Sequence, residues 1–218
     1  MLIGTATSRG ATRHQGSATP KPARLPSRTL DVGRRSRCQR DLALPGLGPV
    51  HHRAYLVESI EDTVARLVEQ FGAGPFFALE NVPLANVTSR GEVAEFSHNS
   101  AFGHLGGDPI ELMEINRLSP ARVAERFSGP RPRLHHIAST VPPSSVEQVR
   151  EALETHGAPG YLQANLDDID LSFHDSSASL GHDVEIHADV ESLQGFFTVF
   201  REAAENWDGS DPIRPALS

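Results

Sequence analysis

The sequence predicts an α+β fold in which one module, made of a strand, a helix and three further strands, occurs twice. The first sign of the repeat is a strand that opens on two adjacent histidines, at residues 50–57 and again at 134–141. The second is an apolar strand that carries a glutamate, at 110–115 and again at 183–187. An internal repeat of this kind determines how the whole chain divides into elements.

The spacing of these histidines and glutamates supports the same division. His52 and His136 are 84 residues apart, and Glu111 and Glu185 are 74 residues apart. Each pair therefore occupies equivalent positions in the two copies, and the second copy is ten residues shorter between histidine and glutamate. The extra residues of the first copy are expected in a loop at 98–108, whose three glycines would let it move and cover a site.

A helix follows the first strand of each copy. In the first copy Ser59 and Asp62 form a capping box, apolar residues recur at helical spacing, and Gly72 ends the helix. In the second copy the serines at 144–145 are expected to cap the helix, and Gly157 ends it. The two glycines are 85 residues apart, within one residue of the histidine offset, so two landmarks agree on the repeat.

Three extended segments follow each helix. They are expected at about 75–82, 91–98 and 109–115 in the first copy, and at about 160–165, 169–175 and 182–188 in the second. A last helix from about 190 to 207 carries an aromatic stripe. Such a stripe either packs on the protein's own core or offers a surface to a partner.

These elements divide the chain into five parts. The predicted parts are a disordered tail rich in Arg, Pro and Ser at 1–47, a first module at 48–118, a linker at 119–133, a second module at 134–188, and a C-terminal helix and tail at 189–218.

Charge is distributed unevenly between the tail and the folded body. Residues 1–49 hold nine of the 20 basic residues and two of the 28 acidic ones, so they carry +7 and the remainder −15. An acidic body argues against a nucleic-acid partner, because phosphate binding requires a clustered basic surface. No apolar run approaches the roughly 20 residues that span a bilayer, so a membrane partner is not expected either.

The tail at 1–47 lacks the apolar periodicity that would form a core, which predicts disorder. Its Arg-rich, Ser-rich and acid-poor composition is also typical of an organellar transit peptide, and upstream sequence from a wrong start site is a third interpretation. Cys38 is the only cysteine. A thiolate metal site is therefore not expected, and a reducing, cytoplasmic location is the default.

Alternation along the strands decides which side chains point together. Residues two apart on a strand share a face, so His52 and His136 lie on equivalent faces of the two copies. The neighbouring His51 and His135 point the other way. The glutamate strands follow the same rule.

Glu111 shares a face with Met113, and Glu185 shares one with His187, whereas Glu114 lies on the opposite face. Two imidazoles and two carboxylates form a donor set that suits one divalent ion such as Fe²⁺, Mn²⁺, Co²⁺, Ni²⁺ or Zn²⁺. His187 is the best placed of the other histidines to orient Glu185 or touch a substrate. The rest are expected at the surface or behind the ligands, and they are His51, His98, His104, His135, His174 and His182.

This repeat resembles the vicinal oxygen chelate superfamily, in particular its glyoxalase I and methylmalonyl-CoA epimerase-like branch. HRAYLV at 52–57 matches the epimerase-like first strand, and HIA at 136–138 matches its counterpart. Glu-Leu at 111–112 and Glu-Ile at 185–186 match the two glutamate strands. The resemblance implies a cup-shaped, barrel-like mixed sheet with the glyoxalase fold. The metal ligands that it implies are His52, Glu111, His136 and Glu185.

The resemblance also implies an activity. Proteins of this branch are metal-dependent isomerases, lyases or epimerases, which remove a proton next to a metal-bound carbonyl. Glu185 and Glu111 are then the implied base and acid. The alternatives are an extradiol-type dioxygenase, which uses two histidines and one carboxylate, and a metal-free antibiotic-binding protein on the same fold. Four retained ligand positions favour the isomerase.

The substrate is less well defined than the metal site. Candidate pocket residues are Phe96, Phe102, Met113 and Phe173. No phosphate-binding motif points to a CoA thioester, and Lys21 is the only lysine. A glutathione hemithioacetal, a CoA thioester and a small aromatic or polyketide-like carbonyl compound all stay open. A homodimer is expected, because the superfamily commonly pairs modules between chains and the last helix offers an apolar face.

Overall fold

The computed structural model describes residues 47–216, and both predicted modules are present in it. The first comprises β1 (Val50–Leu56), α2 (Ile60–Phe71), β2 (Phe76–Leu79), β5 (Glu95–Leu105) and β6 (Asp108–Ser119). The second comprises β7 (Arg133–Val141), α4 (Val146–Thr155), β8 (Gly160–Leu166), β9 (Ile169–His174) and β10 (Asp183–Ala188). The predicted tail, with Cys38, lies outside the described residues apart from Leu47. Among those residues no helix is long and apolar enough to cross a membrane.

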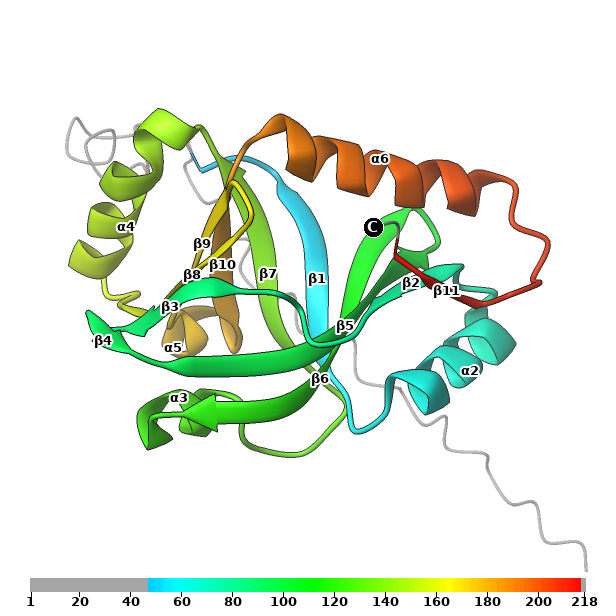
Figure 1. Cartoon of the computed structure of the whole chain (residues 1–218), viewed down its shortest axis with the longest axis horizontal. Coiled ribbons are helices and arrows are strands. Elements are labelled where there is room, and N and C mark those ends of the chain that lie inside the picture. The colour runs from blue at the N-terminus through cyan, green and yellow to red at the C-terminus, as the bar shows by residue number, and fades with distance from the viewer. Residues whose placement is uncertain (1–46, 217–218) are drawn as a thin grey trace, which may run out of the picture. The chain divides into compact units, whose positions relative to one another are not determined.

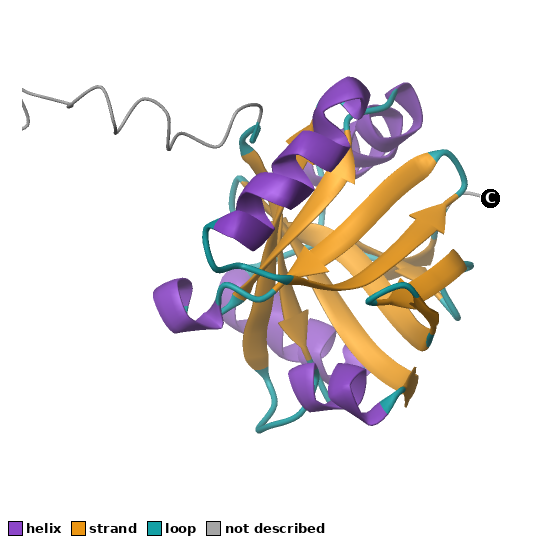
Figure 2. Ribbon diagram, turned by 90° about the vertical axis from the view of Figure 1, so that its left-hand side faces the viewer, coloured by secondary structure: helices purple, strands orange, loops and turns teal. Residues whose placement is uncertain are grey.

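All the strands join in one sheet. Its order is β11-β2-β5-β6-β1-β7-β10-β9-β8-β3-β4. The antiparallel neighbours β1 and β7 lie at its centre. Beyond β1 come β6, β5 and β2, and beyond β7 come their equivalents β10, β9 and β8, so the two modules are related by approximate twofold symmetry. The strands curve around a common interior, and the sheet stays open (Figures 1 and 2). The predicted α+β fold of two βαβββ modules that form a cup-shaped mixed sheet is confirmed.

The prediction of a loop at 98–108 is wrong. Strand β5 continues through these residues to Leu105 and pairs with β6. Only Gly106 and Gly107 form the turn between the two strands. Gly103 indicated mobility in the sequence, yet it lies inside β5 for a packing reason. A Cβ atom at Gly103 would come within 2.6 Å of the Phe76 ring. Glycine here allows the close approach of β2 and β5 instead of movement.

The extra length of the first module lies before β5. Phe102 stands opposite Glu111, and Phe173 stands opposite Glu185. The chain takes 50 residues from His52 to Phe102 but only 37 from His136 to Phe173. The surplus forms the segment 80–94, which we call the strap.

The strap leaves β2, near one end of the strand order, and adds β3 (Ala85–Ser89) and β4 (Glu92–Val93) beside β8 at the other end. It therefore crosses the open side of the curved sheet (Figure 1). Arg90 and Gly91 turn the β3–β4 hairpin with φ angles of 53° and 79°. Two positive φ angles match the right-handed twist of a two-residue hairpin.

The helices begin and end largely as predicted. The Ser59 hydroxyl accepts a hydrogen bond from the Asp62 N–H at 3.1 Å, and Gly72 ends α2 with φ 63°. At α4 the predicted serine cap is absent, because a 3₁₀ turn, Pro143–Ser145, leads directly into the helix and the Ser145 side chain makes no capping bond. Gly157 follows α4 with φ 87°.

The predicted linker contains a short helix, α3 (Ala121–Arg126). The Arg126 guanidinium forms ion pairs with Asp175 and with the buried Asp183, which ties the linker to the second module. Asp183 also accepts a hydrogen bond from the Tyr161 hydroxyl at 2.9 Å. Another short helix, α5 (Ser177–Leu180), precedes β10.

The last helix is α6 (Glu191–Glu205), followed by β11 (Ile213–Pro215) beside β2. Its aromatic stripe packs on the protein's own core: Phe200 stacks on Phe77 at 4.6 Å between ring centroids, and Phe196 contacts Phe102 edge-on at 5.2 Å. This face is therefore not the exposed apolar surface from which a homodimer was expected. The dimer itself stays a prediction.

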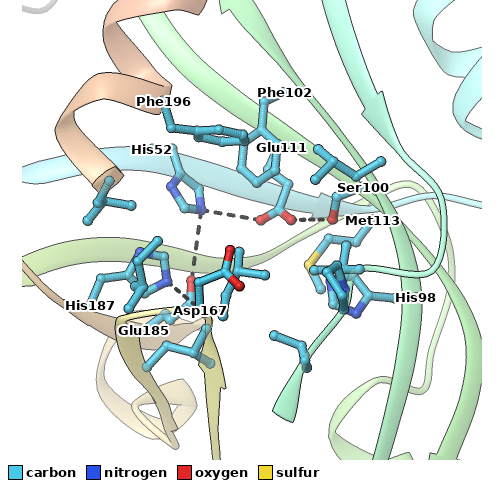
Figure 3. A pocket seen from close by; sticks show the side chains of 18 of the residues that line it. His52, His98, Ser100, Phe102, Glu111, Met113, Asp167, Glu185, His187 and Phe196 are labelled. Atoms are coloured by element: carbon cyan, nitrogen blue, oxygen red, sulfur yellow. Dashed lines mark hydrogen bonds and ion pairs between the residues drawn. The ribbon is translucent and has the colours of Figure 1, made fainter. Parts of the chain in front are cut away.

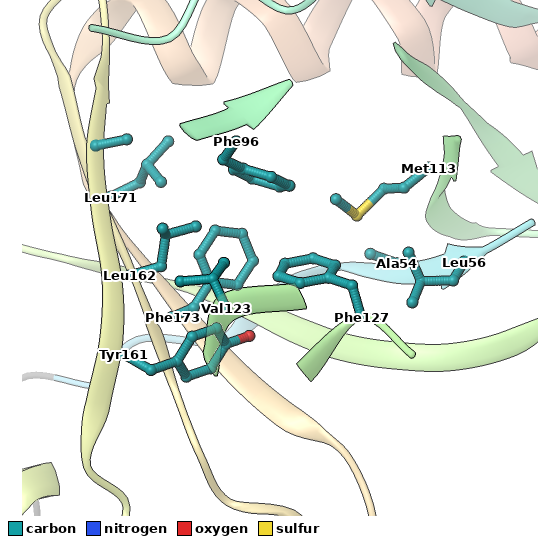
Figure 4. Packing of buried hydrophobic residues seen from close by; sticks show 11 residues of the cluster. Ala54, Leu56, Phe96, Met113, Val123, Phe127, Tyr161, Leu162, Leu171 and Phe173 are labelled. Atoms are coloured by element: carbon teal, nitrogen blue, oxygen red, sulfur yellow. The ribbon is translucent and has the colours of Figure 1, made fainter. Parts of the chain in front are cut away.

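A cluster of aromatic rings forms the core below the concave face (Figure 4). The rings of Phe96, Phe127 and Phe173 meet one another at centroid distances of 5.0 to 6.2 Å, and all three are buried. These residues come from β5, β9 and the segment after α3. Burial of one such side chain contributes roughly 1.5–3 kcal/mol, so the cluster holds both modules and the linker together.

Candidate metal centre

The four predicted ligands lie on the four central strands of the sheet. His52 is on β1, Glu111 on β6, His136 on β7 and Glu185 on β10, and all four side chains are buried. Because equivalent strands of the two modules are neighbours at the centre, the repeat places both histidines and both glutamates at one point. Ligand atoms of His52, Glu111 and His136 lie within 4.8 Å of one another.

Glu185 completes this group from the second module. Its Oε2 lies 3.0 Å from Nε2 of His136 and 3.8 Å from Nε2 of His52. Glu111 shows the matching pattern, with its Oε2 3.2 Å from Nε2 of His52 and 3.7 Å from Nε2 of His136. Figure 3 shows His52 contacting both carboxylates. Nitrogen and oxygen ligands bind zinc at about 2.0–2.2 Å, so neighbouring ligand atoms about 3 Å apart suit such an ion.

The two imidazoles supply an independent test of this fit. Nε2 of His52 and Nε2 of His136 are both buried, and their close contacts with the two carboxylates lack the geometry of a hydrogen bond. Buried polar atoms nearly always have a partner. A divalent cation coordinated by both nitrogens would satisfy them and balance the two carboxylate charges, so the donor set fits the implied metal.

Three of the four groups have the protonation state of a metal ligand. The exception is His136, where burial lowers the pKa but the facing Glu185 outweighs burial and raises the pKa above its ordinary value. Burial alone raises the pKa of Glu185, but the facing His187 and His136 outweigh it and bring the pKa well below its usual value. Burial likewise raises the pKa of Glu111, and its contact with His52 lowers it to a net value below normal. Burial lowers the pKa of His52 below its ordinary value. Metal ligands must be deprotonated, so ionised carboxylates and a neutral imidazole are the required forms.

Each carboxylate is also contacted on the oxygen that faces away from the histidines. The Ser100 hydroxyl donates to Oε1 of Glu111 at 2.5 Å, and Nε2 of His187 lies 3.0 Å from Oε1 of Glu185. The sequence suggested the role of His187. It did not single out Ser100, although a buried serine on the face of β5 that carries Phe102 was the available signal.

The histidines next to the ligands do not simply point away. Nδ1 of His51 lies 3.0 Å from Nδ1 of His52, and Nδ1 of His135 lies 3.0 Å from Nδ1 of His136. His135 is buried and stacks on Phe127 at 4.3 Å. Glu114 does lie away from the centre, where its Oε2 accepts the first backbone N–H of α2 at 3.1 Å.

The other histidines expected at the surface or behind the ligands are mostly internal. His98, His104 and His174 are buried, and His182 is half-buried. His98 lines the cavity in front of the metal centre. A surface location is wrong for the three buried residues, which lie inside the strands β5 and β9.

A cavity of about 400 Å³ opens onto three of the four predicted ligands, His52, Glu111 and Glu185. All four predicted lining residues, Phe96, Phe102, Met113 and Phe173, contribute to its wall. Three further segments that the sequence did not indicate also line it. These are the strap with Val82 and Leu84, the β8–β9 turn with Asp167 and Asp168, and α6 with Phe196 and Phe197.

Fold and site together define a class: a paired βαβββ sheet with a candidate centre of two histidines and two glutamates. No protein-family model and no curated protein matches the sequence. Among solved structures, a hypothetical protein from Bacillus halodurans C-125 is similar at 21% identity and TM-score 0.43, covering 66% of this chain and 95% of that chain.

Methylmalonyl-CoA epimerases are also among the similar structures. The enzyme from Mycobacterium tuberculosis has 14% identity and TM-score 0.43, covering 69% of this chain and 91% of that chain. One from Streptomyces coelicolor, in complex with 2-nitronate-propionyl-CoA, has 14% identity and TM-score 0.36, covering 66% of this chain and 96% of that chain. The likeness is one of fold, and the function proposed here rests on the side chains of this chain.

Proposed function

We propose that the protein is a divalent-metal-dependent isomerase, lyase or epimerase that moves a proton at a carbon next to a carbonyl group. The observation that carries this proposal is the pair of buried carboxylates, Glu111 and Glu185. Each has one oxygen directed to the ligand histidines and the other contacted by a neighbour. Such a pair offers two proton-accepting groups on opposite halves of one site.

A divalent ion in this site would supply a Lewis acid that stabilises charge on a substrate oxygen, typically by several kcal/mol. The chain's own residues supply the rest. Glu185 or Glu111 in its ionised form accepts the proton and becomes a carboxylic acid. That acid returns the proton at another position, or passes it to the other carboxylate, which delivers it to the other face. Ser100 and His187 keep the two carboxylates oriented during this exchange.

The cavity wall supports the same chemistry by excluding water. Phe102, Phe196 and Phe197 lie beside the ligands, and the rings of His52 and Phe197 stack at 5.5 Å. Interactions between charges strengthen where water is removed. A proton held on a carboxylate there exchanges less readily with solvent, which favours its return to the substrate.

The alternative function, an extradiol-type dioxygenase, does not require Glu111 as a metal ligand. An iron site that binds both a catechol and O₂ uses two histidines and one carboxylate. Glu111 would then be a spectator, although its Oε2 contacts His52 and its Oε1 is held by Ser100. The four-donor arrangement favours proton transfer.

Metal analysis followed by a deuterium-exchange screen tests the proposal. We expect about one divalent ion per purified chain, and protein-dependent exchange of a carbon-bound hydrogen in D₂O for one member of a panel of ketones, aldehydes and thioesters. Glu185→Gln should abolish the exchange while the circular dichroism spectrum is unchanged. Oxygen consumption with catechols, and no exchange across the panel, would instead favour the dioxygenase.

A further inference from the structure

The residues that line the cavity indicate which kind of molecule binds in it. Apart from the metal ligands, most of the lining is apolar, with five phenylalanines at its centre. They are Phe96, Phe102, Phe173, Phe196 and Phe197. The volume of about 400 Å³ lies within the range of roughly 300–1,000 Å³ that is typical of small-molecule sites.

Charge is the second property of the wall. Within residues 47–216 no lysine or arginine lines the cavity, and the charged side chains outside the metal centre are Asp167 and Asp168. Both aspartates are exposed, so they lie at the mouth. A carboxylate or phosphate on a ligand would meet like charge there and find no cationic partner.

The start of α6 does not compensate for this lack of cations. Helix N-termini commonly bind anions through free backbone N–H groups. Here Asp168 already lies at that end and accepts a hydrogen bond from the Ser192 hydroxyl at 2.7 Å, and Glu191 adds a second acid in the first turn. The end of α6 nearest the cavity is therefore occupied by negative charge.

The wall of the cavity also contains His98. His98 is buried and stacks on Phe96 at 4.2 Å with the two rings nearly parallel, and its Nδ1 has no hydrogen-bond partner among the described residues. Burial lowers the pKa of His98 to about 4, so the ring is neutral near pH 7. His98 therefore adds no positive charge to the wall.

We infer that the substrate is an uncharged carbonyl compound with an aromatic or similarly bulky apolar body, enclosed beneath α6 and the strap, and not a CoA thioester or a glutathione adduct. The inference rests on the proposed function for the carbonyl group. The apolar body follows from the five phenylalanines, and the lack of charge follows from the acidic mouth.

A pair of ligands that differ only in charge tests this inference. Methyl 4-acetylbenzoate and 4-acetylbenzoate share the ring and the ketone, and only the second is an anion at pH 7. We expect calorimetry on the metal-loaded protein to show at least tenfold tighter binding of the ester, and no binding of propionyl-CoA. Equal or tighter binding of the acid, or binding of propionyl-CoA, would overturn the inference.

A variant of one aspartate at the mouth, Asp167, can be compared with a matched variant of an aspartate outside the cavity. Asp167→Asn should tighten binding of the acid by about threefold, the effect expected for one charge at close range in water, and leave the ester unchanged. Asp211→Asn is the control, because Asp211 is also exposed, has a similar φ of 46° against 51°, and does not line the cavity. An unchanged preference in Asp167→Asn would show that the mouth does not set ligand charge.

Binding and exchange separate this inference from the proposed function. Tight binding of the ester without deuterium exchange of any carbonyl compound overturns the proton-transfer function alone. Exchange with a CoA thioester, but not with neutral aryl ketones, supports the function and overturns the inferred substrate class.

Discussion

His187 contacts the carboxylate of Glu185 on the oxygen that faces away from the ligand histidines, with Nε2 3.0 Å from Oε1. The other oxygen of the same carboxylate lies 3.0 Å from Nε2 of His136. Ser100 makes the equivalent contact with Glu111 in the first module, by a hydrogen bond of 2.5 Å. The repeat thus uses different residues to hold its two carboxylates in the same way.

Loss of this contact should weaken metal binding. Contacts behind metal ligands are typically worth about 10–100-fold in metal affinity, and His187→Ala should lower it by that order. Competition with a chromophoric chelator measures the affinity. The exposed His156→Ala serves as the control and should bind metal as the parent protein does. Wild-type affinity in His187→Ala would show that the contact with Glu185 does not orient the ligand.

Removal of a ligand should empty the site without unfolding the protein. His136→Ala and Glu185→Ala each leave the site with three of its four donors, so both should lose most bound metal and all exchange activity. Elemental analysis and circular dichroism check the two outcomes. Glu114→Ala should keep its metal and lose about 1 kcal/mol of unfolding free energy, because Glu114 accepts the first N–H of α2. Metal loss in Glu114→Ala would contradict the assignment of faces.

Glu111→Ala distinguishes the two enzyme classes. In a four-ligand isomerase it should lower metal occupancy or abolish exchange, because Glu111 contacts both ligand histidines. In a three-ligand oxygenase it should retain iron and oxygen uptake. Metal content and both activities, measured on one preparation, give the answer.

Stability should fall as the pH falls, because of a buried histidine on β9, His174, whose ring contacts Ser172 and Ala158. Burial lowers the pKa of His174 from 6.5 to about 4, so the unfolded chain binds more protons between these pH values and the folded state loses stability as pH falls through this window. His174→Gln removes this contribution. The variant should lose about 3 kcal/mol less than the parent between pH 6.5 and 4 in urea unfolding. His156→Gln is the control. If the unfolding free energy of His174→Gln depends on pH as it does in the parent protein and in the control, this assignment is contradicted.

The aromatic face of α6 should contribute to ligand binding. Phe196 lines the cavity and packs edge-on against Phe102, so Phe196→Ala should weaken binding of a neutral aryl ketone by about tenfold. Calorimetry measures the change. Phe71→Ala is the control, because that ring is 62% exposed on α2 and lies outside the cavity. Equal affinities in the two variants would exclude α6 from the ligand site.

The sequence by itself was sufficient for the fold and for the set of residues at its centre. A period of two in the strands and a repeat offset of about 84 residues determine which side chains share a face. Equivalent strands of paired modules meet at the centre of the sheet, so His52, Glu111, His136 and Glu185 had to come together once the repeat was recognised. The local helix signals Ser59 and Gly72 were also correct, whereas the serine cap expected at 144–145 is absent.

Only the tertiary structure decided what surrounds that centre. The strap and the β8–β9 turn are equivalent connections of very different length, and α6 has no counterpart in the repeat, so no periodicity relates them to the ligands. Gly103 shows the same limit, because its role depends on the ring of Phe76 from another strand. The charge of Asp167 can affect a ligand only because the fold places this residue at the mouth of the cavity. Periodicity orders side chains along one element, whereas a cavity is formed by packing between elements that the sequence does not relate.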